Sequence, residues 1–424
     1  MFWFKLKAGA LQLTLFITVV IALLLTAFIL FIQTHKRFNI QTDFIIETAK
    51  NTDSGISHAL NNIVPLNDTT SINLNGEDFK TLNVHREFWG VFEKVTTISK
   101  IKKNIFKRTA LIGAAQSKNN RTVLYVQDNN KPLVLVGNTK IEGVAYLPKR
   151  GVKNGNISGH SYYGSQLIYG PTKTSTRLPK IFSETKTQIK EIENLISKIE
   201  QNQFINLKVD GSYKNSFLKP VQVIFSNETI VLNAIQLTGN IIVQSKAKII
   251  INASCTLKDI VLIAPEIEIK NNVKGNFQAI ASKNILVGNN VLLEYPSALA
   301  LTGNVAEKPT NLNLIENNRI IIDDDTIIKG LVLYLGVSKP NNHDVQVELK
   351  EKSKIIGEVY CNQNLELKGT VFGTVYTNNF IARQFGSIYQ NHIYNGKIKV
   401  SELPEKYVGL PFNNSKKSVL KWLY

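Results

Sequence analysis

Residues 241–287 read IIVQSKAKIIINASCTLKDIVLIAPEIEIKNNVKGNFQAIASKNILV, and this stretch sets the fold class. Short runs of alternating apolar and polar residues are separated by Asn, Gly, Lys or Asp turns, which is the pattern of β-strands. Ile249, Ile267 and Ile285 recur at equal spacing, eighteen residues apart each time (249, 267, 285). The stretch therefore predicts a mainly β fold built from a structural repeat.

A second alignment supports the same repeat. It is formed by four tripeptides that begin 19, 17 and 21 residues apart: Gly239-Asn240-Ile241, Lys258-Asp259-Ile260, Gly275-Asn276-Phe277 and Pro296-Ser297-Ala298. A repeat near 20 residues with two or three short strands suits one turn of a β-solenoid, in which stacked turns share one core. A β-sandwich built from tight hairpins is the alternative. The period is not six, which disfavours a left-handed hexapeptide helix, so we expect a right-handed β-solenoid (β-helix) over residues 221–395.

The regions on either side of the repeat have a different composition. Residues 66–220 predict a small mixed α+β region, with a long Gly/Ser/Tyr-rich loop near 149–179 and an amphipathic helix over 184–203, for which Ser183 is a candidate N-cap. Within it, FWGVFEKVTTISKIKKNIF fits either a helix or a pair of strands. Residues 396–424 form a C-terminal tail that ends in Trp422-Leu423-Tyr424, for which packing on the domain is the favoured role.

The N-terminus carries a membrane segment. The run AGALQLTLFITVVIALLLTAFILFIQT lies between Lys7 and His35 and holds no charged residue. As a helix it would be about 40 Å long, which exceeds the roughly 30 Å hydrocarbon core of a bilayer. It is also longer than the apolar region of a cleavable signal peptide. Residues 1–37 are therefore predicted to be a short basic leader and a transmembrane helix, and residues 38–65 a helical extension that ends before Pro65.

The flanking charges give the orientation by a narrow margin. Lys5, Lys7 and the α-amino group precede the helix, and Lys36 and Arg37 follow it, which favours a cytoplasmic N-terminus. The bias toward Asn, Lys and Ile fits a bacterial chain. We expect a single-pass protein of the bacterial inner membrane, with its bulk in the periplasm or outside the cell.

The leader and the start of the apolar run resemble a known family. Lys5, Lys7 and the run Ala8-Gly9-Ala10-Leu11 before an apolar helix resemble the N-terminus of type IV pilin-like proteins, especially minor pilins and the K-type pseudopilin. The resemblance implies cleavage by a prepilin peptidase after Gly9, so that Ala10 would become the new N-terminus. Thr14 stands where most of the family has Glu, although K-type members also lack that Glu. The resemblance covers residues 1–63.

A second resemblance concerns the end of the repeat. Residues 355–381, IIGEVYCNQNLELKGTVFGTVYTNNFI, are similar in their glycine and valine rhythm to bactofilins, which are β-helical scaffold proteins. This similarity implies a β-helical architecture and carries no implication of polymer formation.

The chain has a net charge of +18. Such a charge favours anionic partners, although lysines spread over solvated turns would give the same total. The densest candidate basic patch is formed by Lys100, Lys102, Lys103, Lys107 and Arg108. Aromatic residues near it (Phe88, Trp89, Phe92 and Phe106) could indicate single-strand nucleic-acid binding, but an amphipathic packing segment is favoured.

The sequence offers little catalytic chemistry. It contains no phosphate-binding glycine loop, no zinc-type spacing and no nucleophile elbow, and its six histidines are scattered. We therefore expect no catalytic residues, no metal and no cofactor. Asp323-Asp324-Asp325 with Glu294 would be the first residues to test if a carbohydrate-cleaving site existed. Cys255 and Cys361 lie in apolar runs and are expected to be buried core residues.

Three functions fit these observations. We favour a non-enzymatic, membrane-anchored structural or assembly component of a surface, secretion or pilus-like system, with membrane lipid and envelope proteins as partners. The alternatives are a cell-surface module that binds anionic polysaccharide and a β-helical carbohydrate-active enzyme. Nucleic acid is disfavoured as a partner.

Overall fold

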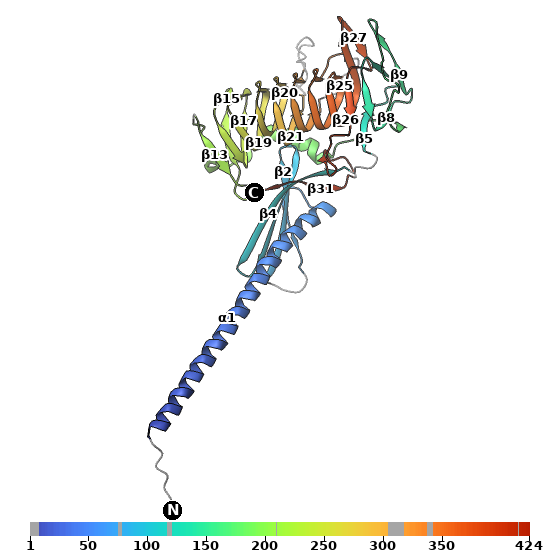
Figure 1. The fold of residues 1–424 in the computed structure, drawn as a ribbon. Helices are drawn as coiled ribbons and strands as arrows, with labels where there is room; N and C mark the ends of the chain where they lie inside the picture. Colours follow the sequence, from blue (N-terminus) through green and yellow to red (C-terminus); the bar gives the residue numbers. More distant parts are fainter. Residues whose placement is uncertain are drawn as a thin grey trace, which may run out of the picture.

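The fold is taken from a computed structural model, which describes residues 8–74, 79–116, 121–208, 210–303, 318–336, 342–413 and 415–424. The described chain is mainly β, with one long N-terminal helix. Figure 1 shows this helix projecting from an antiparallel sheet, and a larger body of parallel strands at the opposite end of the molecule from the N-terminus.

Helix α1 (Ala8–Asn61) runs without interruption through the apolar segment and its predicted extension. The chain contains no proline before Pro65, so no residue of α1 lacks the backbone N–H that a helix hydrogen bond needs. Gly55 weakens the helix locally, but it has a packing role. A Cβ at this position would lie 2.8 Å from Cγ2 of Thr97, so the missing side chain allows the sheet to approach the helix closely.

The C-terminal part of α1 packs on a six-stranded antiparallel sheet. Its strand order is β1-β2-β3-β4-β30, and β31 also pairs with β4; the strands are β1 (Asp68–Ile72), β2 (Lys80–Trp89), β3 (Phe92–Ile101), β4 (Asn104–Ala115), β30 (Val408–Gly409) and β31 (Lys417–Leu423). Of the two readings of FWGVFEKVTTISKIKKNIF, the pair of strands is the one observed. Gly90, with a φ of 63°, supplies the turn between β2 and β3.

A separate hydrophobic core joins the helix to this sheet. On the helix side it contains Ile56 and Ala59, each 1% exposed. They pack with Val84, Val95 and Ile112 of the sheet. The N-terminal half of the same helix buries nothing, since its large apolar side chains from Leu11 to Ile32 are exposed. One continuous helix therefore has a bare half and a packed half.

The parallel body is an insertion within the antiparallel sheet. The chain leaves the sheet at the end of β4, at Ala115, and returns to it at β30, at Val408. Every strand from β5 to β29 lies between these two points. The C-terminal tail thus completes the sheet that the N-terminal strands begin, because β31 pairs with β4 from Thr109 to Ala114.

The strands of the insertion pair mostly in parallel. The first group consists of β5 (Thr122–Val126), β6 (Leu133–Val136), β7 (Lys140–Glu142), β8 (Val144–Leu147), β9 (Val152–Asn154), β10 (Asn156–Ile157), β11 (His160–Ser161), β12 (Thr172–Thr174), β13 (Ser212–Asn215), β14 (Gln222–Ser226), β15 (Ile230–Leu232), β16 (Gln236–Gly239), β17 (Ile241–Ser245) and β18 (Lys248–Ile251). The second group consists of β19 (Thr256–Ile269), β20 (Lys274–Val287), β21 (Leu292–Leu301), β22 (Arg319–Ile322), β23 (Ile327–Tyr334), β24 (Val347–Leu349), β25 (Lys354–Leu367), β26 (Thr370–Gln384), β27 (Ser387–Gln390), β28 (His392–Tyr394) and β29 (Lys397–Lys399).

The register of these strands follows the repeat seen in the sequence. Ile249 of β18 pairs with Ile267 of β19, and Ile267 pairs with Ile285 of β20, which confirms the eighteen-residue alignment. In the second alignment, Ile260 pairs with Phe277 as predicted, but the residues just before them are shifted by one, because Gly275 pairs with Leu257 and Asn276 with Lys258. The last member is shifted by one residue, because the partner of Ala298 is Gln278.

The parallel strands close on themselves and enclose the largest hydrophobic core, which is dominated by Ile, Leu and Val. Their pairing is that of a closed parallel barrel. The predicted right-handed solenoid specifies more than this pairing, namely the stacking of turns and their handedness, and it stays a prediction. Cys255 and Cys361 are free thiols that are 5% and 0% exposed, which confirms that both are buried core residues.

The region predicted as mixed is divided between the two bodies. Strands β1–β4 belong to the antiparallel sheet, whereas β5 pairs with β26 near the C-terminal end of the parallel strands. The long predicted loop contains β9 to β12. The chain then reaches the other end of the parallel strands, where β13 pairs with β16.

The predicted amphipathic helix over 184–203 is interrupted in the structure. It consists of α2 (Ser183–Glu191), a 3₁₀ segment η1 (Ile192–Lys198) and a short η2 (Gln201–Gln203). Four β-branched isoleucines in this stretch lower its helix propensity, so packing decides its shape. Ile189 and Ile192 are buried against the parallel strands. The N-cap prediction was wrong: Phe182 holds that position, and Ser183 is the first helical residue.

Candidate functional site

The bare half of α1 is the first functional feature. Among the described residues, α1 is the one helix long and apolar enough to cross a membrane. Exposed side chains such as Leu23, Leu24 and Phe28 would each favour hydrocarbon over water. This part of the chain has the physical properties of a membrane anchor.

The predicted processing site lies at the start of this helix. Gly9 and Ala10 are exposed, and a Cβ on Gly9 would meet no atom within 4 Å. No packing in the described chain would therefore protect this peptide bond. Lys5 and Lys7, which carry part of the resemblance to pilin-like proteins, lie outside the described residues.

The structure separates the five residues of the candidate basic patch. Lys100, Lys102 and Lys103 lie at the turn between β3 and β4, with the Lys102 ammonium 4.6 Å from the Phe44 ring of α1. Lys107 points to the opposite side of the sheet, where it lines a pocket. Arg108 forms an ion pair with Asp53 of α1 and stacks on Trp422. The five cations are therefore divided among three places, namely the turn beside α1, the pocket and an ion pair with α1.

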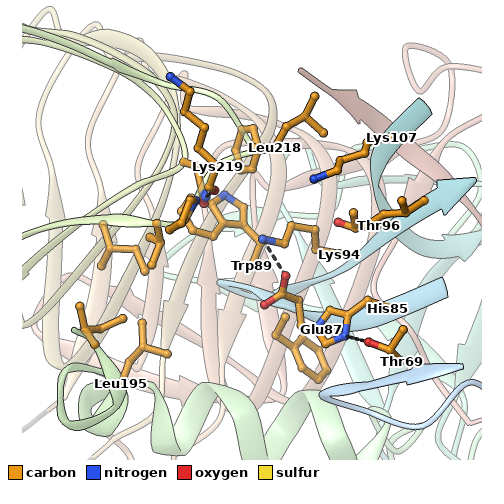
Figure 2. A pocket seen from close by; sticks show the side chains of 18 of the residues that line it. Thr69, His85, Glu87, Trp89, Lys94, Thr96, Lys107, Leu195, Leu218 and Lys219 are labelled. Atoms are coloured by element: carbon orange, nitrogen blue, oxygen red, sulfur yellow. Dashed lines mark hydrogen bonds and ion pairs between the residues drawn. The ribbon is translucent and has the colours of Figure 1, made fainter. Parts of the chain in front are cut away.

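The pocket lies between the antiparallel sheet and the first parallel strands, and has a volume of about 500 Å³. Its walls come from β1–β4, from η1, from the segment that precedes β14 and from β17 (Figure 2). Figure 2 also shows two interactions inside it: Glu87 pairs with Lys94 at 2.9 Å, and His85 lies 3.1 Å from the Thr69 hydroxyl. Lys107 and Lys219 add positive charge. The pocket could hold an anionic ligand with an apolar face, such as an acidic sugar.

The aromatic residues beside this pocket serve packing. Trp89 is 4% exposed, and its ring meets Phe217 edge-on, with the ring centroids 5.2 Å apart. The Lys94 ammonium lies 5.5 Å from the Trp89 ring. Phe92 is also buried. A platform for stacking nucleic-acid bases needs exposed rings, so this arrangement supports the packing interpretation.

A buried charge network joins the segment after α1, the sheet and the insertion. Arg86 of β2 donates two hydrogen bonds to Glu93 of β3, at 2.9 and 3.0 Å, and a third to the carbonyl of Val64 at 3.0 Å. Arg86 also pairs with Glu184 of α2. Lys417 of β31 approaches Glu93 at 2.7 Å. The network therefore ties together residues from five separate segments.

The balance of charge in this network decides the protonation of Glu93. Burial by itself would raise the pKa of the Glu93 carboxyl, but Arg86 and Lys417 outweigh it, and the pKa is lowered. The pKa of Arg86 is raised, because Glu93 and Glu184 outweigh the burial that would lower it. Both groups therefore stay charged around neutral pH, and each compensates the charge of the other in a site that is shielded from water.

A second buried carboxyl has the opposite behaviour. Glu358 of β25 is 1% exposed, accepts a hydrogen bond from the backbone of Leu410 at 2.6 Å, and pairs with the Gln116 amide. Burial raises the pKa of Glu358 to about 7, although these hydrogen bonds and Arg121 act in the other direction. The buried Oε1 of Gln116 has no hydrogen-bond partner among the residues that the structure describes. A protonated Glu358 could donate to it once the amide rotates.

The raised pKa of Glu358 predicts a pH-dependent stability. The folded state binds the Glu358 proton more tightly than the unfolded chain, so stability falls as the pH rises from 4.5 to about 7. The loss is about 3 kcal/mol at full ionisation. Glu358→Gln keeps an acceptor for the Leu410 N–H and, once the Gln116 amide rotates, donates to the Gln116 Oε1. We expect this variant to lose that pH dependence, and to be more stable than the parent above pH 7.

Urea denaturation of the parent and the variant at several pH values, followed by far-UV circular dichroism, measures this difference. Glu268→Gln is the control, because Glu268 is partly exposed and its pKa is lowered by Lys248 and Lys270. Parallel pH profiles for the parent and Glu358→Gln would contradict the assignment.

The candidate carbohydrate-cleaving residues do not form one described cluster. Asp323 pairs with Lys350 at 2.5 Å, and Glu294 pairs with Lys329 at 2.8 Å. Asp325 adopts a positive φ of 56° in the turn before β23, which is a structural role that Asp tolerates. Within the described residues, no group of three His, Cys, Asp or Glu side chains could hold a metal ion.

Sequence reasoning missed both buried carboxyl sites. Glu358 interrupts the apolar run IIGEVY, and Arg86 and Glu93 flank the hairpin at Gly90. A charged residue at an apolar position was the available signal. This signal does not reveal which groups the buried carboxylates contact, because Lys417 and Leu410 lie far away along the chain.

The fold and these sites define a β-rich protein with an N-terminal helix suited to membrane anchoring. No protein-family model matches the chain, and no curated protein matches it. Among solved structures, the crystal structure of the competence-associated pilin ComZ from Thermus thermophilus is similar at 10% identity, with a TM-score of 0.21, over 85% of this chain and 86% of that chain. A similarity this low does not show a shared fold, so the class of this chain follows from its own residues.

Proposed function

We propose that this chain is a non-enzymatic, single-pass membrane protein, and that it acts as a pilin-like structural or assembly component. The observation that carries the proposal is helix α1, whose N-terminal half is bare and apolar while its C-terminal half packs on an antiparallel sheet. A helix of this kind can hold a folded domain at a fixed distance from a bilayer. It can also pack against copies of itself.

The proposal includes the architecture of the insertion and its location. The parallel strands are proposed to form a right-handed solenoid whose stacked turns present one elongated body away from the membrane. The equal spacing of Ile249, Ile267 and Ile285 supports this description. The N-terminus is proposed to lie in the cytoplasm, and the bulk of the chain outside it. Cleavage after Gly9 is part of the same proposal, and an intact Met1 in the mature protein would remove it.

A charge placed in the bare half of α1 tests the anchor. Leu23→Arg should raise the free energy of membrane insertion by about 3–4 kcal/mol, because the favourable leucine is lost and an arginine at the centre of a membrane helix is poorly solvated. The measurement is the fraction of full-length protein that stays with membranes after carbonate extraction. Leu23→Ala is the matched control, and it should leave that fraction nearly unchanged.

Equal extraction of Leu23→Arg and the control would contradict a membrane-spanning role for α1. Orientation is read separately, by labelling Ser387→Cys in intact cells with a membrane-impermeant maleimide, since both native cysteines are buried. Cleavage of a polysaccharide that is lost on Asp323→Ala would overturn the non-enzymatic part of the proposal.

A further inference from the structure

The turn between β3 and β4 lies at the end of the sheet that is nearest the bare half of α1. Lys102 in this turn is 4.6 Å from the ring of Phe44 and 4.9 Å from the ring of Phe79. Further along the helix, Asp53 pairs with Arg108 of β4. The hairpin therefore runs beside α1 with its turn toward the N-terminus of the helix, as Figure 1 shows for the lower end of the sheet.

The position of Phe44 sets the distance from this turn to a bilayer. The uncharged segment ends at Thr34, and the ten residues from there to Phe44 rise about 15 Å. The headgroup layer fills about 5–8 Å of that distance. The remaining gap of roughly 7–10 Å is close to one Debye length at physiological salt, and a modest helix tilt would close it further.

The residues at this turn suit a lipid surface. We define the hairpin tip as Lys100, Lys103, Ile105 and Phe106. Ile105 is 58% exposed and Phe106 is 42% exposed, although both are large apolar side chains. Lys100 and Lys103 are exposed and form no ion pair with any carboxylate of the described chain. Apolar side chains beside free cations are the combination that binds membrane interfaces.

The nearby part of the helix adds positive charge. Lys36 and Arg37 follow the uncharged segment and are exposed. The carboxylates of Glu47 and Asp53 are already paired, with Lys80 and Arg108 respectively. Asp43 is the remaining acidic side chain on this stretch of the helix. The described surface that faces the bilayer is therefore predominantly cationic.

We propose that the hairpin tip docks on anionic phospholipid headgroups of the bilayer that α1 crosses. This inference rests on the proposed function, because the helix must span the bilayer to bring the tip within reach. Tethering by the helix raises the effective concentration of the tip at the surface, so contacts that are weak individually suffice. Docking would fix the tilt of the protein before it assembles.

The test uses the full-length protein in nanodiscs of phosphatidylcholine, with or without phosphatidylglycerol. A fluorophore is attached at Asn104→Cys, next to the tip, and a quencher is carried on the lipid headgroups. Ser387→Cys at the far end of the insertion carries the control label. We expect quenching at position 104 to increase when the anionic lipid is present and to decrease with added salt, and position 387 to be unaffected.

A pair of charge variants makes the test specific. Lys100→Gln with Lys103→Gln should lower the ratio of docked to undocked protein at least about fivefold, which is the contribution of one lysine near an anionic leaflet. Lys149→Gln with Lys208→Gln, which removes two exposed lysines far from the tip, should leave the ratio unchanged. Lys102 is retained, because it packs on Phe44 and Phe79.

The outcomes separate this inference from the proposed function. If the protein fails to enter nanodiscs of either composition, the membrane-anchor proposal fails. If it enters both and the label at 104 reports no difference between them, the lipid-docking inference fails. A soluble acidic polysaccharide is added in a further arm. If this polymer, and not the anionic lipid, protects the label at position 104 from the quencher, the tip binds a different partner and the inference is overturned.

Discussion

Replacing Gly357 with alanine is expected to unfold the parallel strands. Gly330, Gly357 and Gly373 pair with one another across β23, β25 and β26, with φ values of 140°, 150° and 150°. A Cβ on Gly357 would lie closer than 3.0 Å to the carbonyl oxygen of Gly330, and the same conflict recurs at each step of this column. Because the obstacle is backbone, only separation of the strands could relieve it.

We therefore expect Gly357→Ala to lose at least about 4 kcal/mol of folding free energy, in the range of the most damaging single substitutions. Gly373→Ala should behave in the same way. The measurement is urea denaturation of the full chain in detergent, followed by circular dichroism at the β-sheet band. A variant too unstable to purify is compared by its yield of folded protein.

Gly151→Ala separates backbone strain from steric conflict. Gly151 also has a positive φ, of 67°, but a Cβ there would meet no atom within 4 Å. Its replacement should cost only about 1–2 kcal/mol. If Gly357→Ala is no more damaging than Gly151→Ala, the close stacking of the glycine column is refuted.

The second large effect is expected at the buried ion pair. Glu93→Gln removes the charge that satisfies Arg86, which is 2% exposed. Breaking one partner of a buried pair leaves the other charge uncompensated, at a cost of about 3–5 kcal/mol. The partly exposed Glu184 remains beside Arg86, so we expect a value near the lower limit. Denaturation at neutral pH measures it.

The lowered pKa of Glu93 gives this prediction a pH signature. Its contribution to stability is present above the ordinary carboxyl pKa of 4.5 and is lost as the pH falls through the lower, folded-state value. The difference between the parent and Glu93→Gln should therefore shrink in acid. This is the opposite direction from Glu358.

Two further variants complete the test of the ion pair. Glu268→Gln, at a partly exposed carboxylate, should cost less than about 1 kcal/mol. The double variant Arg86→Met with Glu93→Leu replaces both charges by apolar groups and should be more stable than Glu93→Gln alone. A loss for Glu93→Gln that is as small as that for Glu268→Gln would show that the network adds nothing to stability.

Local patterns in the sequence were sufficient for several features. Twenty-seven consecutive residues without charge, from Ala8 to Thr34, can satisfy their backbone in an apolar surrounding only as a helix. The spacing of Ile249, Ile267 and Ile285 predicted their pairing, because each must face the same core to remove its side chain from water. Burial of Cys255 and Cys361 followed from the apolar runs around them.

Other features depend on contacts between distant residues. Lys417 reaches Glu93 across 324 positions of the chain, and β31 pairs with a strand that precedes the whole insertion. The separation of the basic patch into a hairpin tip, a pocket rim and an ion pair with α1 likewise depends on the fold. The interruption of the predicted helix at Ile192 reflects packing that overrides local propensity.

The sequence alone predicted the long apolar helix and the eighteen-residue pairing of Ile249, Ile267 and Ile285, since each depends on a pattern within a short segment. Only the tertiary structure decided that the C-terminal strand closes the N-terminal sheet around a large insertion, and which charges meet there. Such pairings depend on which surfaces meet after the chain has folded back on itself, and no local pattern of residues encodes that choice.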